Sequence, residues 1–260
     1  MNHLKTQRKI NSPINVETVD ARNALRARAK KRKAPPSVDT ITEQVLIAIW
    51  EHRLPPGTKL VEEKLGEAFG VSRTKVRQAL GKLAHDGVLT IYPNRGTFVS
   101  SPTIEEAHHV FDARRLIEPT LTRQTAQNAT KEQIARLGRN VELEFDARTR
   151  NDRHTIIRLA GQFHILMAEM SGNPFLLKSM RELCSLTCLI IALYDSSPSI
   201  PSCQNHEHKD LVAAMKARDG ERAASIMMAH LNHIEHSLDL QIAHAASIDL
   251  EAVFAQVRTI

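Results

Sequence analysis

The side chains best suited to chemistry lie in one short stretch of the chain and are cationic or hydrogen-bonding. They are Arg73, Thr74, Lys75, Arg77 and Gln78. On a helix, this spacing places them on the first two turns, beside an apolar face. An arginine guanidinium can donate two parallel hydrogen bonds to O6 and N7 of guanine in the major groove. The stretch therefore predicts a surface that reads double-stranded DNA.

A helix-turn-helix is the element that would present these side chains. Residues 64–70 (KLGEAFG) and 71–83 (VSRTKVRQALGKL) show two short helical patterns that meet at Gly70. Glycine permits the left-handed backbone that ends a helix tightly, and Ser72 supplies an N-cap for the second helix. The inward face of the second helix is apolar: Val76, Leu80 and Leu83. Its first turns would reach the base edges.

A hairpin follows the second helix. Residues 88–92 (VLTIY) and 97–99 (TFV) are typical of two strands that are joined through PNRG. The tip of such a wing would carry Asn94, Arg95 and Gly96. These residues can lie against phosphates or in the minor groove, since glycine lets the backbone approach and arginine is attracted to the negative potential there. The alternative is a solvated helix face followed by an ordinary hairpin.

Residues 55–99 resemble the winged helix-turn-helix of the GntR family of bacterial transcription regulators. The matching motifs are PPGTKL, GVSRTKVRQAL, DGVL and PNRG, in this order. The resemblance implies that Arg73, Thr74 and Arg77 contact DNA and that Gly96 lies at the wing tip.

Two positions depart from the family pattern. Lys75 stands where proline is usual, and Glu63 stands where one subfamily has a base-contacting arginine. We expect Lys75 to add a phosphate contact and Glu63 to change the preferred operator.

The chain after residue 100 is predicted to be an all-α bundle. Apolar residues recur at spacings of three and four, and alternating strand-like runs are missing. Thr103 should cap the first helix. Breaks at Thr130, 151–152, 171–174, 195–202 and 219–220 delimit about six helices. The predicted fold is therefore mainly α: a basic arm (1–36), a winged helix-turn-helix (37–100), an antiparallel helical domain (103–247) and a tail (248–260).

The helical part resembles the FCD ligand-sensing domain of FadR-type regulators. The matching segments are FDARRLIEPTLTRQTA, FHILMAEMSGNPFL, EHKDLVAAMKARD and MMAHLNHIE. In metal-binding members an aspartate and three histidines hold a divalent ion, and the histidines correspond to His164, His208 and His230. Imidazoles suit zinc and nickel. The aspartate position holds Ala160, so the resemblance implies a three-histidine centre that water or an effector oxygen completes.

The same resemblance makes Arg114 the candidate for binding an effector carboxylate, since a guanidinium fork binds a carboxylate through two parallel bonds. The alternative for Arg114 is a structural ion pair with Glu118 or another helix. The alternative for the three histidines is an ordinary structural role. We assign that ordinary role to His108, His109, His154, His233, His236 and His244.

Charge is distributed unevenly along the chain. The net charge is +6, but residues 1–36 alone carry ten Lys and Arg against Glu17 and Asp20. A basic arm on a near-neutral body indicates a polyanionic partner.

The longest apolar run, 189–193, is too short for a membrane helix, and the N-terminus does not resemble a secretory signal. We therefore expect a cytoplasmic protein without a membrane partner. Cys184, Cys188 and Cys203 are interpreted as reduced thiols.

Together these features predict a homodimeric transcription regulator that acts as a repressor, binds a palindromic operator and responds to a small carboxylate. Two half-sites are expected because one short helix reads only a few base pairs. A metal-dependent enzyme and a nonspecific architectural DNA binder are the alternatives. The enzyme is disfavoured because the sequence holds no phosphate loop, nucleophile elbow or HExxH motif.

Overall fold

The computed structural model describes residues 35–195 and 207–240. The described residues from Ser37 onward belong to one compact unit. The predicted basic arm lies outside the described residues, apart from its last two positions, and so do the predicted tail, Cys203 and His244.

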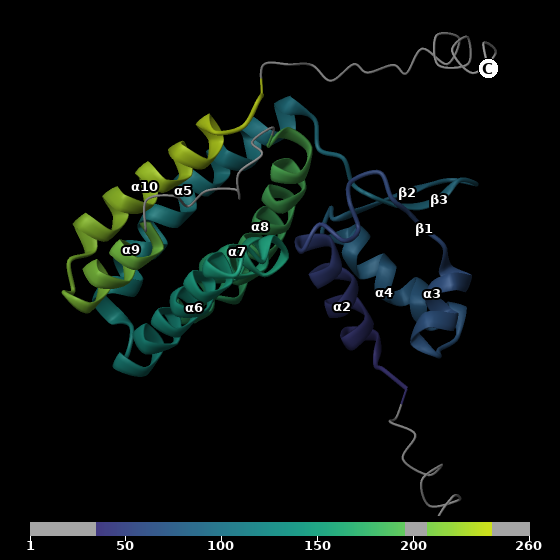
Figure 1. Cartoon of the computed structure of the whole chain (residues 1–260), viewed down its shortest axis with the longest axis horizontal. Coiled ribbons are helices and arrows are strands. Elements are labelled where there is room, and N and C mark those ends of the chain that lie inside the picture. The colour runs from purple at the N-terminus through teal and green to yellow at the C-terminus, as the bar shows by residue number, and fades with distance from the viewer. Residues whose placement is uncertain (1–34, 196–206, 241–260) are drawn as a thin grey trace, which may run out of the picture. The chain divides into compact units, whose positions relative to one another are not determined.

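Three helices form the helix-turn-helix: α2 (Val38–Trp50), α3 (Glu62–Phe69) and α4 (Arg73–His85) (Figure 1). Gly70 ends α3 with a left-handed backbone at φ 65°, as its position predicts. The Ser72 side chain accepts a hydrogen bond from the Lys75 amide and so caps α4. The predicted inward face is confirmed, since Val76, Leu80 and Leu83 are buried with residues of α2 such as Ile41 and Val45.

The wing belongs to a sheet of three strands: β1 (Lys59–Leu60), β2 (Leu89–Tyr92) and β3 (Gly96–Val99). The order is β1-β3-β2 and both pairings are antiparallel, with Leu60 opposite Thr97 and Tyr92 opposite Gly96. The sequence predicted only the β2–β3 hairpin. It missed β1 because a strand of two residues is too short to show an alternating pattern.

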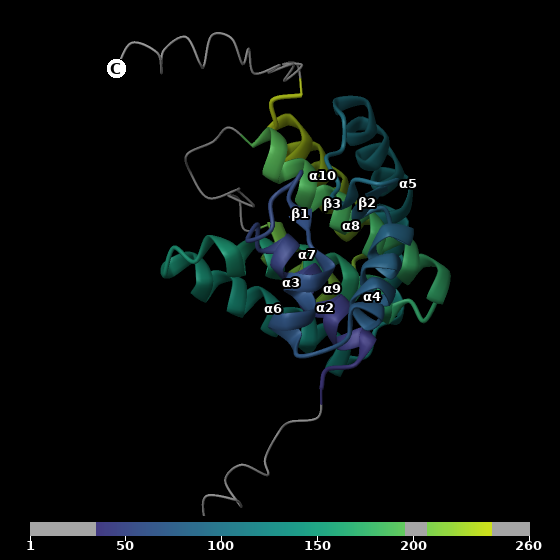
Figure 2. The same ribbon diagram turned by 90° about the vertical axis from the view of Figure 1, so that its right-hand side faces the viewer.

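Six helices follow within the described residues: α5 (Ile104–Asn128), α6 (Lys131–Thr149), α7 (Arg153–Met170), α8 (Pro174–Tyr194), α9 (Glu207–Lys216) and α10 (Gly220–His236). Their boundaries fall at the predicted breaks. Thr103 and Thr130 both close capping boxes, with Glu106 and Gln133 as the returning side chains. The long helices α5 and α10 run side by side in both views (Figures 1 and 2).

The core of the helical part is built from aliphatic, methionine and alanine side chains, as the low aromatic content requires. Helix α8 also contacts the helix-turn-helix. The Trp50 indole N–H donates to Ser185 Oγ at 3.1 Å, and His52 Nε2 lies 3.0 Å from the Cys188 carbonyl oxygen. Leu189 packs in the same cluster as the α2 and α4 side chains.

Within the described residues, none of the helices combines the length and the apolar character that crossing a membrane requires.

Candidate functional site

The predicted DNA-contacting residues of α4 lie on one face. Arg73, Thr74, Arg77 and Gln78 are exposed, Lys75 is half-buried, and Val76 between them is buried. The first turn of α4 contains no acidic residue. Cationic side chains at a helix N-terminus oppose the helix dipole, so the helix gains no stability from them. An exposed, locally unfavourable cationic turn is typical of a surface that meets a polyanion.

The wing tip is also exposed. Asn94 adopts φ 60° and Gly96 φ 102°, which is backbone that glycine and asparagine accept most readily. The Arg95 guanidinium lies 5.5 Å from the centre of the Tyr92 ring, which directs its side chain along the hairpin. The tip therefore presents one cation beside two residues that keep the backbone tightly turned.

Two glutamates of α3 contact the arginines of α4. Arg77 donates from Nε and Nη2 to the two carboxylate oxygens of Glu62, at 2.9 and 2.7 Å, and Arg73 Nη2 donates to Glu63. The Arg77 guanidinium lowers the pKa of the Glu62 carboxyl through this hydrogen bond. The sequence singled out Glu63 only as a departure and missed Glu62, because nothing local to α3 shows which α4 side chain each glutamate meets.

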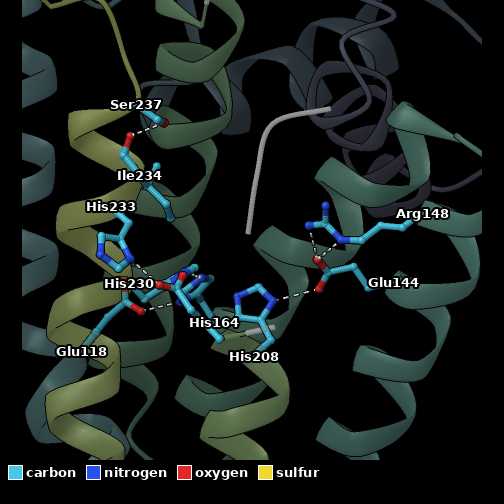
Figure 3. A network of polar contacts seen from close by, with 10 residues as sticks. Glu118, Glu144, Arg148, His164, His208, His230, His233, Ile234 and Ser237 are labelled. Carbon is cyan, nitrogen blue, oxygen red and sulfur yellow. Dashed lines mark hydrogen bonds and ion pairs between the residues drawn. The ribbon is translucent and has the colours of Figure 1, made fainter. Parts of the chain in front are cut away.

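Inside the helical domain, the structure brings together the three predicted histidines. His164 comes from α7, His208 from α9 and His230 from α10, and all three are buried. One nitrogen from each ring lies within 4.8 Å of the others. In Figure 3 the three rings converge on a common centre.

A glutamate stands behind each of these imidazoles. His208 Nδ1 is 2.8 Å from Glu144, and His230 Nδ1 is 2.7 Å from Glu207. His164 Nδ1 contacts Glu118 in the same way. Metal-binding histidines commonly donate their outer N–H to a carboxylate, which fixes the ring and makes the inner nitrogen a better ligand.

These contacts determine what the inner nitrogens can bind. Burial lowers the pKa of His164 to about 3 and also lowers that of His230, so both rings are neutral. A neutral imidazole whose Nδ1–H faces a carboxylate carries a lone pair on Nε2. His164 Nε2 and His230 Nε2 lie 3.3 Å apart, and His208 Nε2 has no hydrogen-bond partner among the described residues. Converging lone pairs require a cation or a donor, so the residues fit a divalent ion.

The supporting glutamates are ionised. Burial is the largest single influence on Glu118 and by itself would raise its pKa, but Arg114 and His164 together outweigh burial and bring the pKa to about 2. Burial likewise opposes ionisation of Glu144 and Glu207, but charge interactions and hydrogen bonds with their partners bring each pKa to about 2. The sequence pointed to Glu118 only as a possible partner of Arg114 and did not single out Glu144 or Glu207. Only the spacing of four between Arg114 and Glu118, and between Glu144 and Arg148, was a local signal.

A cavity of about 70 Å³ adjoins the histidines. Arg114, Arg148, Ala160, Cys184 and Thr187 are among its lining residues. Ala160 occupies the position where the FCD pattern has an aspartate, so no carboxylate from that position enters the cavity. The volume suits one ion with water or a ligand of a few heavy atoms.

Arg114 lies in this lining but is already paired. Its Nε donates to Glu118 at 2.6 Å, four residues along α5, and its Nη1 donates to Thr187 at 3.2 Å. The alternative role of Arg114, an ion pair with Glu118, is therefore present in the structure, and Arg114 still lines the cavity.

The Cys184 and Cys188 thiols are buried and reduced, and burial raises the pKa of both, to about 12 for Cys188.

Most of the histidines assigned an ordinary role lie away from this centre. His108 pairs with Glu235, His154 Nδ1 donates to the Glu51 carbonyl, and His236 Nδ1 donates to the Asn232 carbonyl. His233 is the exception, because its Nδ1 contacts Glu207, the carboxylate behind His230. It supports the centre from outside without facing it.

Comparison with protein families gives two matches. Residues 37–99 match the family described as bacterial regulatory proteins, gntR family, and residues 109–233 match the FCD domain. The two matches are adjacent and together cover most of the described chain.

Curated relatives agree with the family matches. The HTH-type transcriptional repressor RspR of Escherichia coli K12 is 27% identical over 185 residues, which span 71% of this chain and 81% of RspR. The HTH-type transcriptional repressor NanR of Salmonella newport is 29% identical over 242 residues, which span 81% of this chain and 88% of NanR.

Solved structures share the fold. A transcriptional regulator GntR from Rhodococcus sp. RHA1 superposes with a TM-score of 0.67 at 21% identity, covering 76% of this chain and 95% of its own. McbR/YncC of E. coli superposes with a TM-score of 0.69 at 20% identity, with the same coverage of both chains.

Proposed function

Since the chain belongs to the GntR family of bacterial regulatory proteins and carries an FCD domain, we propose that it is a transcriptional repressor controlled by a small organic acid. The DNA-binding part of this proposal rests on the exposed face of α4, where Arg73 and Arg77 lie opposite the buried Val76 and Leu80. Such a face can enter the major groove while the apolar side stays in the core.

The proposed active species is a homodimer. The first two turns of α4 can reach only a few base pairs, which is too short a sequence to be distinguished among the sites of a genome. Two copies on a palindromic operator would double the recognised length, with half-sites about one helical turn apart.

The proposed sensor is the histidine centre together with Arg114. His164, His208 and His230 would hold zinc or a related divalent ion, and the ion would supply an open position for an effector oxygen. Arg114 on the cavity wall would bind the effector carboxylate. Replacement of the usual aspartate by Ala160 leaves room beside the ion, which favours an effector oxygen there.

Helix α8 is the proposed link between the sensor and the DNA-binding part. Thr187 lines the cavity, while neighbouring Ser185 and Cys188 bind Trp50 and His52 at the end of α2. A ligand that moves α8 would therefore also move α2. A coupling free energy of about 1 to 3 kcal/mol is enough to change operator occupancy.

The relatives are repressors, and the chain is a regulator rather than an enzyme. The metal-dependent enzyme kept as an alternative is therefore set aside. The architectural DNA binder differs from a repressor in one measurable property, which is its equal affinity for all sequences.

Selection from a pool of randomised duplexes tests the proposal. We expect the full-length protein to enrich two inverted half-sites about 10 base pairs apart, centre to centre. Arg77→Ala should bind the selected duplex about 5- to 150-fold more weakly and lose discrimination at one base pair per half-site. Arg139→Ala, at an exposed arginine of α6, is the matched control and should change neither property. Enrichment of no sequence would refute the proposal in favour of the architectural binder.

A further inference from the structure

The two arginines that face DNA are held by acidic side chains of the neighbouring helix. Glu62 and Glu63 begin α3, and Arg73 and Arg77 lie in the first two turns of α4. Both pairs are on the surface, but the glutamate side chain of the Arg77 pair is only 27% exposed against 73% for the arginine. Glu62 is therefore the anchored partner and Arg77 the projecting one.

The atoms used in the Arg77 pair leave a specific part of its guanidinium available. Glu62 accepts from Nε and Nη2. A guanidinium has five N–H groups, so one hydrogen on Nη2 and both on Nη1 remain. The described residues provide no further hydrogen-bond partner for the Arg77 side chain. The remaining Nη1–Nη2 edge is a second fork, and its parallel N–H bonds match O6 and N7 of guanine.

The negative charge of Glu62 also favours guanine over phosphate as the partner of Arg77. A free arginine on a DNA-facing helix binds any phosphate it can reach, which adds affinity without sequence information. A carboxylate bonded to the guanidinium compensates its charge and repels phosphate. Guanine is affected less, because it presents neutral acceptor atoms.

We propose that Glu62 is a positioning residue that determines DNA specificity: it holds Arg77 by one edge and presents the other edge to a guanine. Glu63 holds Arg73 through a single nitrogen, so its effect is smaller. This inference rests on the proposed DNA-binding function. The ordinary role of both glutamates, favourable contact with the N-terminal dipole of α3, would not depend on which base lies in the groove.

The test uses full-length protein and the duplex that the wild type selects from the randomised pool. Dissociation constants are measured by fluorescence anisotropy for that duplex, for a random duplex of equal length, and for the selected duplex with 7-deazaguanine at the Arg77-dependent position. The wild type should lose about 10-fold in affinity on the deaza duplex, because N7 is the acceptor that is removed.

Glu62→Gln should bind random DNA more tightly than the wild type and reduce the ratio of selected to random affinity by about 10-fold. In Glu62→Gln, most of the affinity loss that 7-deazaguanine causes in the wild type (the deaza penalty) should also disappear. Glu62→Asp keeps the charge but shortens the reach, so it should lose the deaza penalty without gaining random affinity. Glu67→Gln, at an exposed glutamate of the same helix, is the matched control and should keep the wild-type ratio.

Thermal melting of each variant shows that the proteins compared are folded. The inference is wrong if Glu62→Gln and Glu62→Asp both retain the wild-type ratio and deaza penalty. That result differs from failure of the proposed function, in which the wild type itself selects no sequence.

Discussion

Each of the three buried imidazoles turns one nitrogen to a glutamate and the other to a shared centre. This arrangement distinguishes them from His108 and His236, which have single partners near the surface. Ionised glutamates behind the imidazoles make the inner nitrogens better ligands. The site is therefore suited to a divalent ion even though Ala160 contributes no carboxylate.

Zinc binding by the full-length protein checks this interpretation. We expect His164→Ala to abolish binding in isothermal titration calorimetry and to remove the rise in melting temperature that zinc gives the wild type. Glu207→Gln should weaken zinc binding by about 10- to 100-fold, because it alters the partner of His230. His236→Ala is the control. Equal zinc affinity in wild type and His164→Ala would show that the ion binds elsewhere.

A different residue should give the stability of the protein a pH dependence. Burial lowers the pKa of His52 from 6.5, against the opposing effect of its Cys188 carbonyl contact. The unfolded chain therefore binds a proton at His52 more readily, so this contribution to stability is complete above pH 6.5 and is lost as the pH falls towards the folded pKa. His52→Gln can still donate to the carbonyl but does not titrate.

Melting temperatures at pH 7.5 and at pH 5.5 would measure this effect. The wild type should lose more stability on acidification than His52→Gln does. Parallel pH profiles for the two proteins would contradict the assignment.

Among the elements, the turn between α3 and α4 sets how the proposed DNA-contacting residues of α4 are presented. Gly70 is left-handed there, with open space around its Cα, so only backbone strain opposes a side chain. Gly81 in the middle of α4 also has open space but an ordinary helical backbone. Because neither position is crowded, comparing them isolates the backbone cost of a side chain in the left-handed region.

We expect Gly70→Ala to destabilise the protein by about 1 to 2 kcal/mol, because alanine disfavours the left-handed region. Gly81→Ala should instead stabilise it by about 0.5 to 1 kcal/mol, because alanine is the better helix former. Urea unfolding monitored by circular dichroism measures both. A stabilising Gly70→Ala would mean that the turn relaxes out of its left-handed conformation.

At the scale of the whole chain, the net positive charge is concentrated in sequence before the helix-turn-helix. Residues 1–36 have a net charge of +8 and the rest of the chain −2, yet residues 1–36 contain no pattern that would read bases. Such a segment adds phosphate contacts, which raise affinity for every duplex. We therefore expect residues 1–36 to contribute mainly to affinity and α4 to contribute mainly to specificity.

Deletion of residues 1–36 should therefore weaken binding to selected and random duplexes by similar factors. It should also reduce the slope of log Kd against log salt, because fewer counterions are released. The selected sequence should stay the same. A changed consensus would show that the arm takes part in base recognition.

The sequence by itself determined the elements of this protein. Local signals fixed the Gly70 turn, the Ser72 and Thr103 caps, the inward face of α4 and the breaks between the six helices, since each depends on neighbours within about one helical turn. The family patterns pointed to the three histidines, which share no such local relation.

Only the tertiary structure decided what surrounds those residues. The glutamate behind His208 is 64 positions away and the partner of Arg77 is 15 away, on another helix. Strand β1 likewise exists only because β3 pairs with it. Side-chain periodicity records which face of an element is buried but not which side chain of another element it meets, so these contacts follow from packing alone.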